Sequence, residues 1–217
     1  MLLLDRDYAA RSAIELVGNR HNLESRQRMA LSRYACCVQA VQRRKARRVE
    51  PIDARGEELW LDGYDILTVL ESARAGGIIL PGRDGCCRDI AGIHRRYRKA
   101  NETVSALRLA GEKLAAMGVG LSRWLLDQPV SNSGRLKTLI LETARNEGWN
   151  MEVELTFSPD HLLARTNHII ATSDGIVLDR CVRWINLTRM IIAEKIPKAN
   201  IVDLSADAVV RGPPGVS

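Results

Sequence analysis

The chain has 217 residues, 46% of them hydrophobic, and a formal net charge of +6. That hydrophobic content excludes a disordered chain, and no apolar run approaches the roughly 20 residues that a membrane-spanning helix needs. Residues 1–56 hold 12 basic and 6 acidic side chains, so the whole net charge lies there, while residues 57–217 are balanced. This division predicts a segment that faces a polyanion, joined to a separate globular domain.

The sequence predicts a cytoplasmic protein with no membrane partner. Its opening apolar run ends at Asp5, which is too early for the core of a signal peptide. The five cysteines show no zinc-site spacing, so we expect reduced thiols that pack as small hydrophobic side chains. Aromatic residues make up only 4% of the chain, which argues against a module that reads single strands by stacking bases on exposed rings.

The basic region, residues 1–56, is expected to be helical. Apolar spacing predicts one helix over 3–19 and a second over 24–47, followed by a linker at 51–56. The second helix ends in five basic side chains, Arg43, Arg44, Lys45, Arg47 and Arg48. Cations suit a helix C-terminus, but five exceed what a cap requires. Two interpretations stay open: a surface that binds the RNA backbone, or a solvated helix face.

From residue 57 onward, short apolar runs alternate with helical segments. We expect strands at 59–61, 121–126, 151–157, 168–172 and 183–186, a hairpin over 78–87, helices over 66–75, 90–117, 131–147 and 187–195, and a flexible tail over 197–217. This alternation predicts an α/β domain over 57–196, with a mostly parallel sheet flanked by helices. Ligands bind such sheets at the carboxyl ends of the strands.

Three predicted strands are followed by an aspartate: Asp62, Asp127 and Asp174. If these strands are neighbours, three carboxylates converge, and their mutual repulsion makes a bound cation favourable. Carboxylate oxygens are ligands that favour Mg²⁺ or Mn²⁺. Such an ion can activate a water molecule for attack and hold a phosphodiester in place for hydrolysis. The alternative is that each aspartate only caps the helix that follows it.

Other polar residues lie close to these strand ends in the sequence. Asp65 and Glu71 belong to the helix after the first strand, and Asp179 follows Asp174 by five residues, so each is a possible additional ligand. Ser131 and Ser133 open a helix, where hydroxyl and backbone N–H groups predict either a phosphate seat or an ordinary cap.

A second group of cations follows the hairpin. Arg88 and Arg95 are spaced to share one face of a helix. They are interpreted either as contacts to RNA phosphates beside the site or as part of a solvated face.

Two motifs carry a resemblance to a known class of domain. Leu59–Asp65, with the sequence LWLDGYD, resembles the hydrophobic strand and "DGYN" opening of PIN-like and NYN-type metal-dependent ribonuclease domains. Ala171–Asp174, ATSD, is similar to their later "T-x-D" strand end. The order of a helical N-terminal region, DGY, LD-x-P-V-S-x-S-G and ATSD resembles an uncharacterised prokaryotic "domain of unknown function" family, from about residue 3 to residue 195.

The resemblance implies a PIN-like, Rossmann-like three-layer fold and an endoribonuclease site. Asp62, Asp127 and Asp174 would then be metal ligands, and Asp65 stands where NYN-type domains usually have Asn. Candidates for the fourth acidic residue usual in PIN domains are Glu71, Asp89 and Asp179.

Three functions follow from this reading. The first is a Mg²⁺- or Mn²⁺-dependent ribonuclease, the second a non-catalytic RNA-binding module, and the third a phosphohydrolase with Asp62 as its nucleophile.

Overall fold

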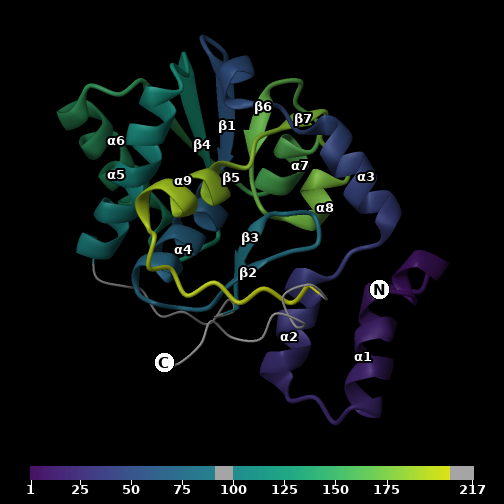
Figure 1. Ribbon diagram of the computed structural model, residues 1–217. Coiled ribbons are helices and arrows are strands. Elements are labelled where there is room, and N and C mark those ends of the chain that lie inside the picture. The colour runs from purple at the N-terminus through teal and green to yellow at the C-terminus, as the bar shows by residue number, and fades with distance from the viewer. Residues whose placement is uncertain (91–99, 206–217) are drawn as a thin grey trace.

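A computed structural model describes residues 1–90 and 100–205 of the chain (Figure 1). Its N-terminal part contains a short 3₁₀ turn, η1 (Leu4–Arg6), three helices, α1 (Ala10–Arg20), α2 (Ser25–Tyr34) and α3 (Val38–Arg47), and a second 3₁₀ turn, η2 (Pro51–Ala54). No helix in these ranges is long and apolar enough to cross a membrane.

The prediction of one helix over 24–47 is wrong, because the chain bends between α2 and α3. Ala35 adopts an extended conformation with ψ 133°, and Cys37 starts α3 by accepting a hydrogen bond on its Sγ from the Ala40 N–H at 3.4 Å. The first helix also begins later than predicted, since Asp7 adopts a left-handed conformation with φ 60°. The apolar spacing in the sequence continues through Asp7 and Ala35, so it did not indicate either break.

The body is built on one five-stranded sheet, in which every pair of neighbouring strands is parallel. Its strands lie in the order β5 (Met151–Thr156), β4 (Leu121–Asp127), β1 (Glu58–Asp62), β6 (Ile169–Ala171) and β7 (Arg183–Trp184). Two further strands, β2 (Ile79–Pro81) and β3 (Cys87–Asp89), form an antiparallel hairpin. The predicted α/β class and parallel sheet are therefore confirmed.

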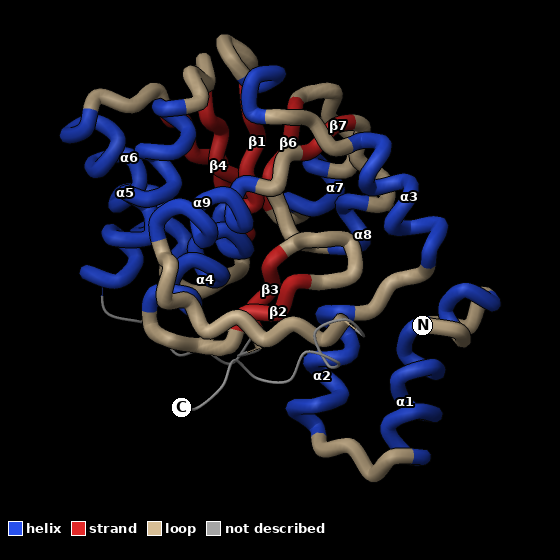
Figure 2. Tube along the Cα trace, in the orientation of Figure 1, coloured by secondary structure: helices blue, strands red, loops and turns tan. Residues whose placement is uncertain are grey.

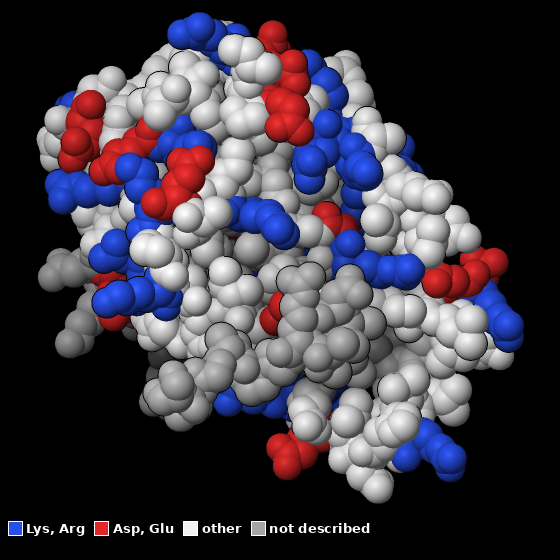
Figure 3. All heavy atoms as spheres, viewed as in Figure 1, with Lys and Arg blue, Asp and Glu red and all other residues white. Residues whose placement is uncertain are grey.

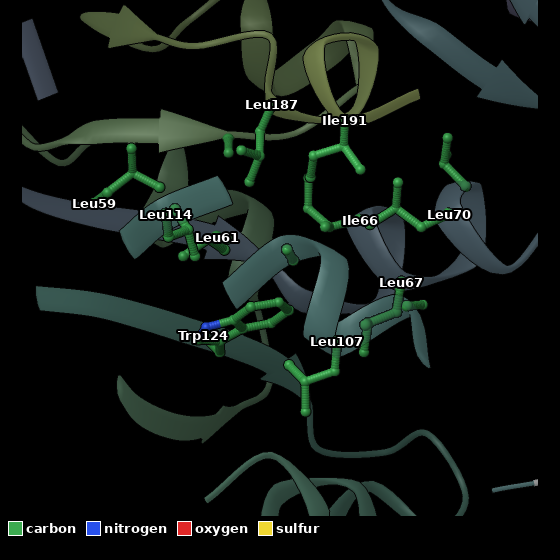
Figure 4. Packing of buried hydrophobic residues seen from close by; sticks show 14 of the residues in the cluster. Leu59, Leu61, Ile66, Leu67, Leu70, Leu107, Leu114, Trp124, Leu187 and Ile191 are labelled. Atoms are coloured by element: carbon green, nitrogen blue, oxygen red, sulfur yellow. The ribbon is translucent and has the colours of Figure 1, made fainter. Parts of the chain in front are cut away.

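Helices cover both faces of this sheet (Figures 1 and 2). They are α4 (Gly63–Arg74), α5 (Ala100–Ala116), α6 (Ser133–Glu147), α7 (Pro159–Leu163), α8 (Gly175–Leu178) and α9 (Leu187–Lys195). On one face Leu61 and Trp124 pack with Leu107 and Ile191 of the covering helices (Figure 4). Because successive strand residues point to opposite faces, Leu125 instead joins a smaller core under α7 and α8.

The N-terminal helices divide into a packed part and a projecting part. Helix α3 is fixed to the sheet, since the Trp184 indole N–H donates to the Arg44 carbonyl at 2.7 Å. Helices α1 and α2 form a hairpin that extends away from the five-stranded sheet (Figure 1), although α2 contacts β2 and β3. Near the other end of the chain, the Ile79 N–H donates to the Asn200 carbonyl and the Val202 N–H donates to the Ile79 carbonyl. This part of the expected flexible tail is therefore paired with β2.

Candidate active site

The strand order brings the predicted aspartates to one edge of the sheet. Strands β4, β1 and β6 are consecutive neighbours, and Asp127 and Asp62 are the last residues of β4 and β1. Asp174 follows the last residue of β6 by three positions. The carboxyl edge, as we call this region, also contains Asp65 in the first turn of α4 and Asp160 in α7.

Asp62 and Asp65 are held by the residues that follow β6. The Thr172 hydroxyl donates to Asp62 Oδ2 at 3.1 Å, and the Asp65 N–H donates to Asp62 Oδ1 at 3.2 Å. Asp65 receives two hydrogen bonds from Ser173, at 2.6 Å each, from its backbone N–H and from its hydroxyl. Both carboxylates therefore have fixed orientations before any ligand arrives.

The electrostatics of the carboxyl edge reflect crowding of like charges. Burial, followed by repulsion from Asp65, raises the pKa of Asp62 well above its ordinary value. Burial also raises the pKa of Asp65, where the hydrogen bonds from Ser173 act in the opposite direction. The pKa of Asp160 is raised by burial and by repulsion from Asp174 and Asp127. The edge is therefore a site where added positive charge would be stabilising.

Asp160 is a residue of the carboxyl edge that the sequence pattern does not indicate. It lies in the first turn of a short helix after β5, directly behind Pro159, and a helix start is an ordinary place for an acidic residue. Only the pairing of β5 with β4 brings it to the carboxyl edge. In the sequence, the one sign of its position is that it directly follows a proline just after the end of a predicted strand.

Asp127 and Asp174 border the edge in different ways. Asp127 lies near the Tyr64 side chain, whose pKa is raised by burial and by this negative charge. The Tyr64 hydroxyl is buried and has no hydrogen-bond partner within the described residues. Asp174 caps α8 by accepting from the N–H groups of Ile176 and Val177, at 2.7 and 3.1 Å. The alternative role as a helix cap is thus found for Asp174, and also for Asp62, which caps α4 by accepting from the Asp65 N–H at 3.2 Å.

The donor set at the edge fits a hard cation in its chemistry, because all five side chains offer carboxylate oxygens. Within residues 1–90 and 100–205, however, no three His, Cys, Asp or Glu side chains are grouped so that they could hold a metal ion by themselves. Mg²⁺ commonly uses only one or two carboxylates and takes its other ligands from water and substrate phosphates. A cation at the edge would therefore have to be held in that open way, because the described residues form no closed protein cage.

Several of the basic residues predicted to contact RNA are paired with acidic side chains of the protein itself. Asp84, whose side chain is fully buried, contacts Arg44 at 2.5 Å and Arg88 at 2.6 Å. Arg44 also contacts Asp179 at 2.8 Å, as does Arg43. These five residues form the buried ion-pair network, as we call it, which joins α3 to the β2–β3 hairpin and to α8.

The network changes the interpretation of several predicted residues. Arg44 is only 5% exposed and Arg88 only 6%, so neither presents a solvated surface. Asp179 faces two arginines, which outweigh the effect of burial and lower its pKa, so it serves the network. Arg47 donates to the Asp179 carbonyl at 2.8 Å. From the sequence we predicted RNA contacts for these arginines and a metal-ligand role for Asp179, because the sequence does not show which side chains pair in the folded protein.

The remaining predicted residues lie apart from this network. Ser133 is buried and donates its hydroxyl to the Gln128 carbonyl at 3.0 Å, whereas Ser131 is exposed. Lys45 and Arg48 are exposed, Glu71 accepts from the Thr103 hydroxyl at 2.6 Å, and Asp89 is buried in β3. Arg95 lies outside the described residues. On the face seen in Figure 3, Lys and Arg side chains are interspersed with Asp and Glu.

Comparison with known proteins identifies two consecutive families. Residues 1–47 match a family described as "Protein of unknown function (DUF434)", and residues 51–190 match one described as "Domain of unknown function (DUF5616)". Neither is described as a PIN or NYN domain, so that finer likeness stays a prediction. The uncharacterized protein MJ0935 of Methanocaldococcus jannaschii is 25% identical over 176 residues, covering 81% of this chain and 84% of that protein. No solved structure matches. With most of its length matched, the chain belongs to the family of the domain of unknown function DUF5616.

Proposed function

We propose that the chain hydrolyses phosphodiester bonds of RNA at the carboxyl edge, with Mg²⁺ or Mn²⁺ as its cofactor. The supporting observation is that Asp62, Asp65 and Asp160 lie together at one edge of a parallel sheet, where burial and neighbouring carboxylates both act to raise their pKa values. Repulsion of this kind is relieved by a cation, and the edge is where ligands bind in sheets of this class.

One or two carboxylates from among Asp62, Asp127 and Asp160 would hold the cation, and water and phosphate oxygens would supply its other ligands. Both oxygens of Asp62 and both oxygens of Asp65 already accept hydrogen bonds; Asp65 is the less available of the two, because its hydrogen bonds from Ser173 are 2.6 Å long, against 3.1 and 3.2 Å at Asp62. When bound, such a cation lowers the pKa of a water molecule and neutralises charge on the phosphate. Thr172 orients the Asp62 carboxylate, and Ser173 fixes Asp65, so the protein contributes a rigid arrangement of acidic groups.

A specific observation favours a second function, that of a non-catalytic RNA-binding module. The described residues hold no ready group of three metal-binding side chains, and Asp174 uses one carboxylate oxygen as a helix cap. In this alternative the acidic edge serves to shape the fold, and RNA affinity is independent of divalent cations.

Cleavage of end-labelled RNA distinguishes the two functions. Unpaired and hairpin RNAs are incubated with Mn²⁺ and the wild-type chain, Asp62→Asn, or Asp127→Asn. The matched control is Glu147→Gln, which removes an acidic charge from an exposed ion pair with Arg108 on another part of the surface. Hydrolysis predicts cleavage by wild type and the control and background cleavage by both aspartate variants. Equal product from all four proteins, or none from any, would contradict it.

A further inference from the structure

A groove opens beside the carboxyl edge and is separate from the buried ion-pair network. It has a volume of about 690 Å³ and lies between α7 and α8, with Asp127 and Asp160 among its lining residues. Sites that hold a small ligand typically have volumes of about 300–1,000 Å³. The groove therefore has room for one nucleotide next to the carboxylates.

Two large apolar side chains flank this groove while remaining open to solvent. Phe157 follows β5 and is 73% exposed, and Ile176 in α8 is 66% exposed. Phe157 is the only phenylalanine of the chain. An exposed ring costs solvation free energy that burial would recover, and the flat face of a nucleobase is one partner that can cover it.

Two cations lie on the same groove. Arg165 follows α7 and Arg180 follows α8, and both are exposed lining residues. Neither forms an ion pair or a side-chain hydrogen bond with another described residue, in contrast to Arg43, Arg44 and Arg88. Unpaired guanidinium groups fit phosphate oxygens well. The groove thus combines a ring for a base, cations for phosphate, and carboxylates beside both.

We infer that this groove binds one unpaired nucleotide of an RNA strand, with its base against Phe157 and Ile176 and its phosphate near Arg165 and Arg180. This inference rests on the proposed function, because the neighbouring phosphodiester would then lie at Asp127 and Asp160. A base inside a duplex cannot stack on a side chain without first leaving its neighbours. The low aromatic content argues against a surface of many rings, but one ring is enough for one base.

Binding of a short labelled RNA, measured by fluorescence anisotropy in EDTA, tests the groove without any cleavage. The RNA is used unpaired and annealed to its complement. Phe157→Ala should weaken binding of the unpaired strand by about 5- to 100-fold, the range of one lost stacking contact, while Phe157→Tyr retains it. Ile52→Ala is the matched control, because Ile52 is 70% exposed and lies before β1, at the opposite end of that strand from the carboxyl edge.

Salt dependence gives a second, independent readout. Arg165→Gln and Arg180→Gln should each reduce the slope of log affinity against log salt by about 1, and Arg74→Gln, an exposed residue of α4, should leave it unchanged. Phe157→Ala binding unpaired RNA as tightly as Ile52→Ala, or an equal loss for the duplex, would overturn the inference.

The outcomes also separate this inference from the proposed function. Phe157-dependent binding without cleavage supports the groove and contradicts hydrolysis. Cleavage by wild type with unchanged binding by Phe157→Ala supports hydrolysis and overturns the groove.

Discussion

Replacement of the buried Asp84 should destabilise the protein strongly. Asp84 accepts hydrogen bonds from Arg88 at 2.8 and 2.6 Å, from Arg44 at 2.5 Å and from the Cys86 N–H at 3.1 Å. Asp84→Asn keeps the size of the side chain but leaves Arg88, which is 6% exposed, without a carboxylate partner. Breaking a buried pair in this way costs about 3–5 kcal/mol.

The loss is measured by urea unfolding and by the melting temperature at neutral pH. For a chain of this size, 1 kcal/mol corresponds to about 2–4 °C, so the melting temperature of Asp84→Asn should fall by about 6–20 °C. Glu147→Gln is the control, because its pair with Arg108 is exposed on both sides and such pairs contribute about 0–1 kcal/mol. A loss for Asp84→Asn no greater than that of the control would refute the structural importance of the network.

Three further predictions concern acidic groups and packing. Burial would raise the pKa of Asp84 and Asp179, but their arginine partners outweigh burial and lower both pKa values. The two carboxylates therefore stabilise the fold above about pH 4, and this contribution is lost as the pH falls further. Urea midpoints measured across acid pH should decline steeply, and a flat response would contradict this. Asp62→Asn should raise the urea midpoint at neutral pH, because the raised pKa of Asp62 means that its ionised form opposes folding; a lower midpoint than wild type would speak against this. Gly111→Ala should cost about 1–3 kcal/mol, because the added methyl group would collide with the Trp149 indole, and unchanged stability in thermal unfolding would show that the indole can move aside.

The main elements of the fold could be predicted because the sequence pattern is regular in the body. Apolar runs ending at Asp62 and Asp127 coincide with β1 and β4, and the alternation with helices indicated a parallel sheet. The breaks at Asp7 and Ala35 could not be predicted, because they interrupt no apolar spacing.

The candidate site was only partly predictable. Strand ends give the aspartates that follow them directly, but Asp160 reaches the edge only through strand pairing. The partners of Arg44 are 40 and 135 residues away along the chain, at Asp84 and Asp179. A cluster of cations in the sequence therefore resembled an RNA-binding surface, although folding turns Arg44 and Arg88 inward.

Thermal unfolding in the presence of Mn²⁺ tests most directly whether the carboxyl edge holds a divalent cation. A ligand present at about 100 times its dissociation constant stabilises the folded state by about 2.7 kcal/mol, which corresponds to about 5–11 °C here. We predict that Mn²⁺ raises the melting temperature of the wild-type chain in this way, that EDTA reverses the rise, and that the rise is lost in Asp62→Asn. A wild-type chain that shows no rise, or an equal rise in Asp62→Asn, would contradict the assignment of the cation to this edge.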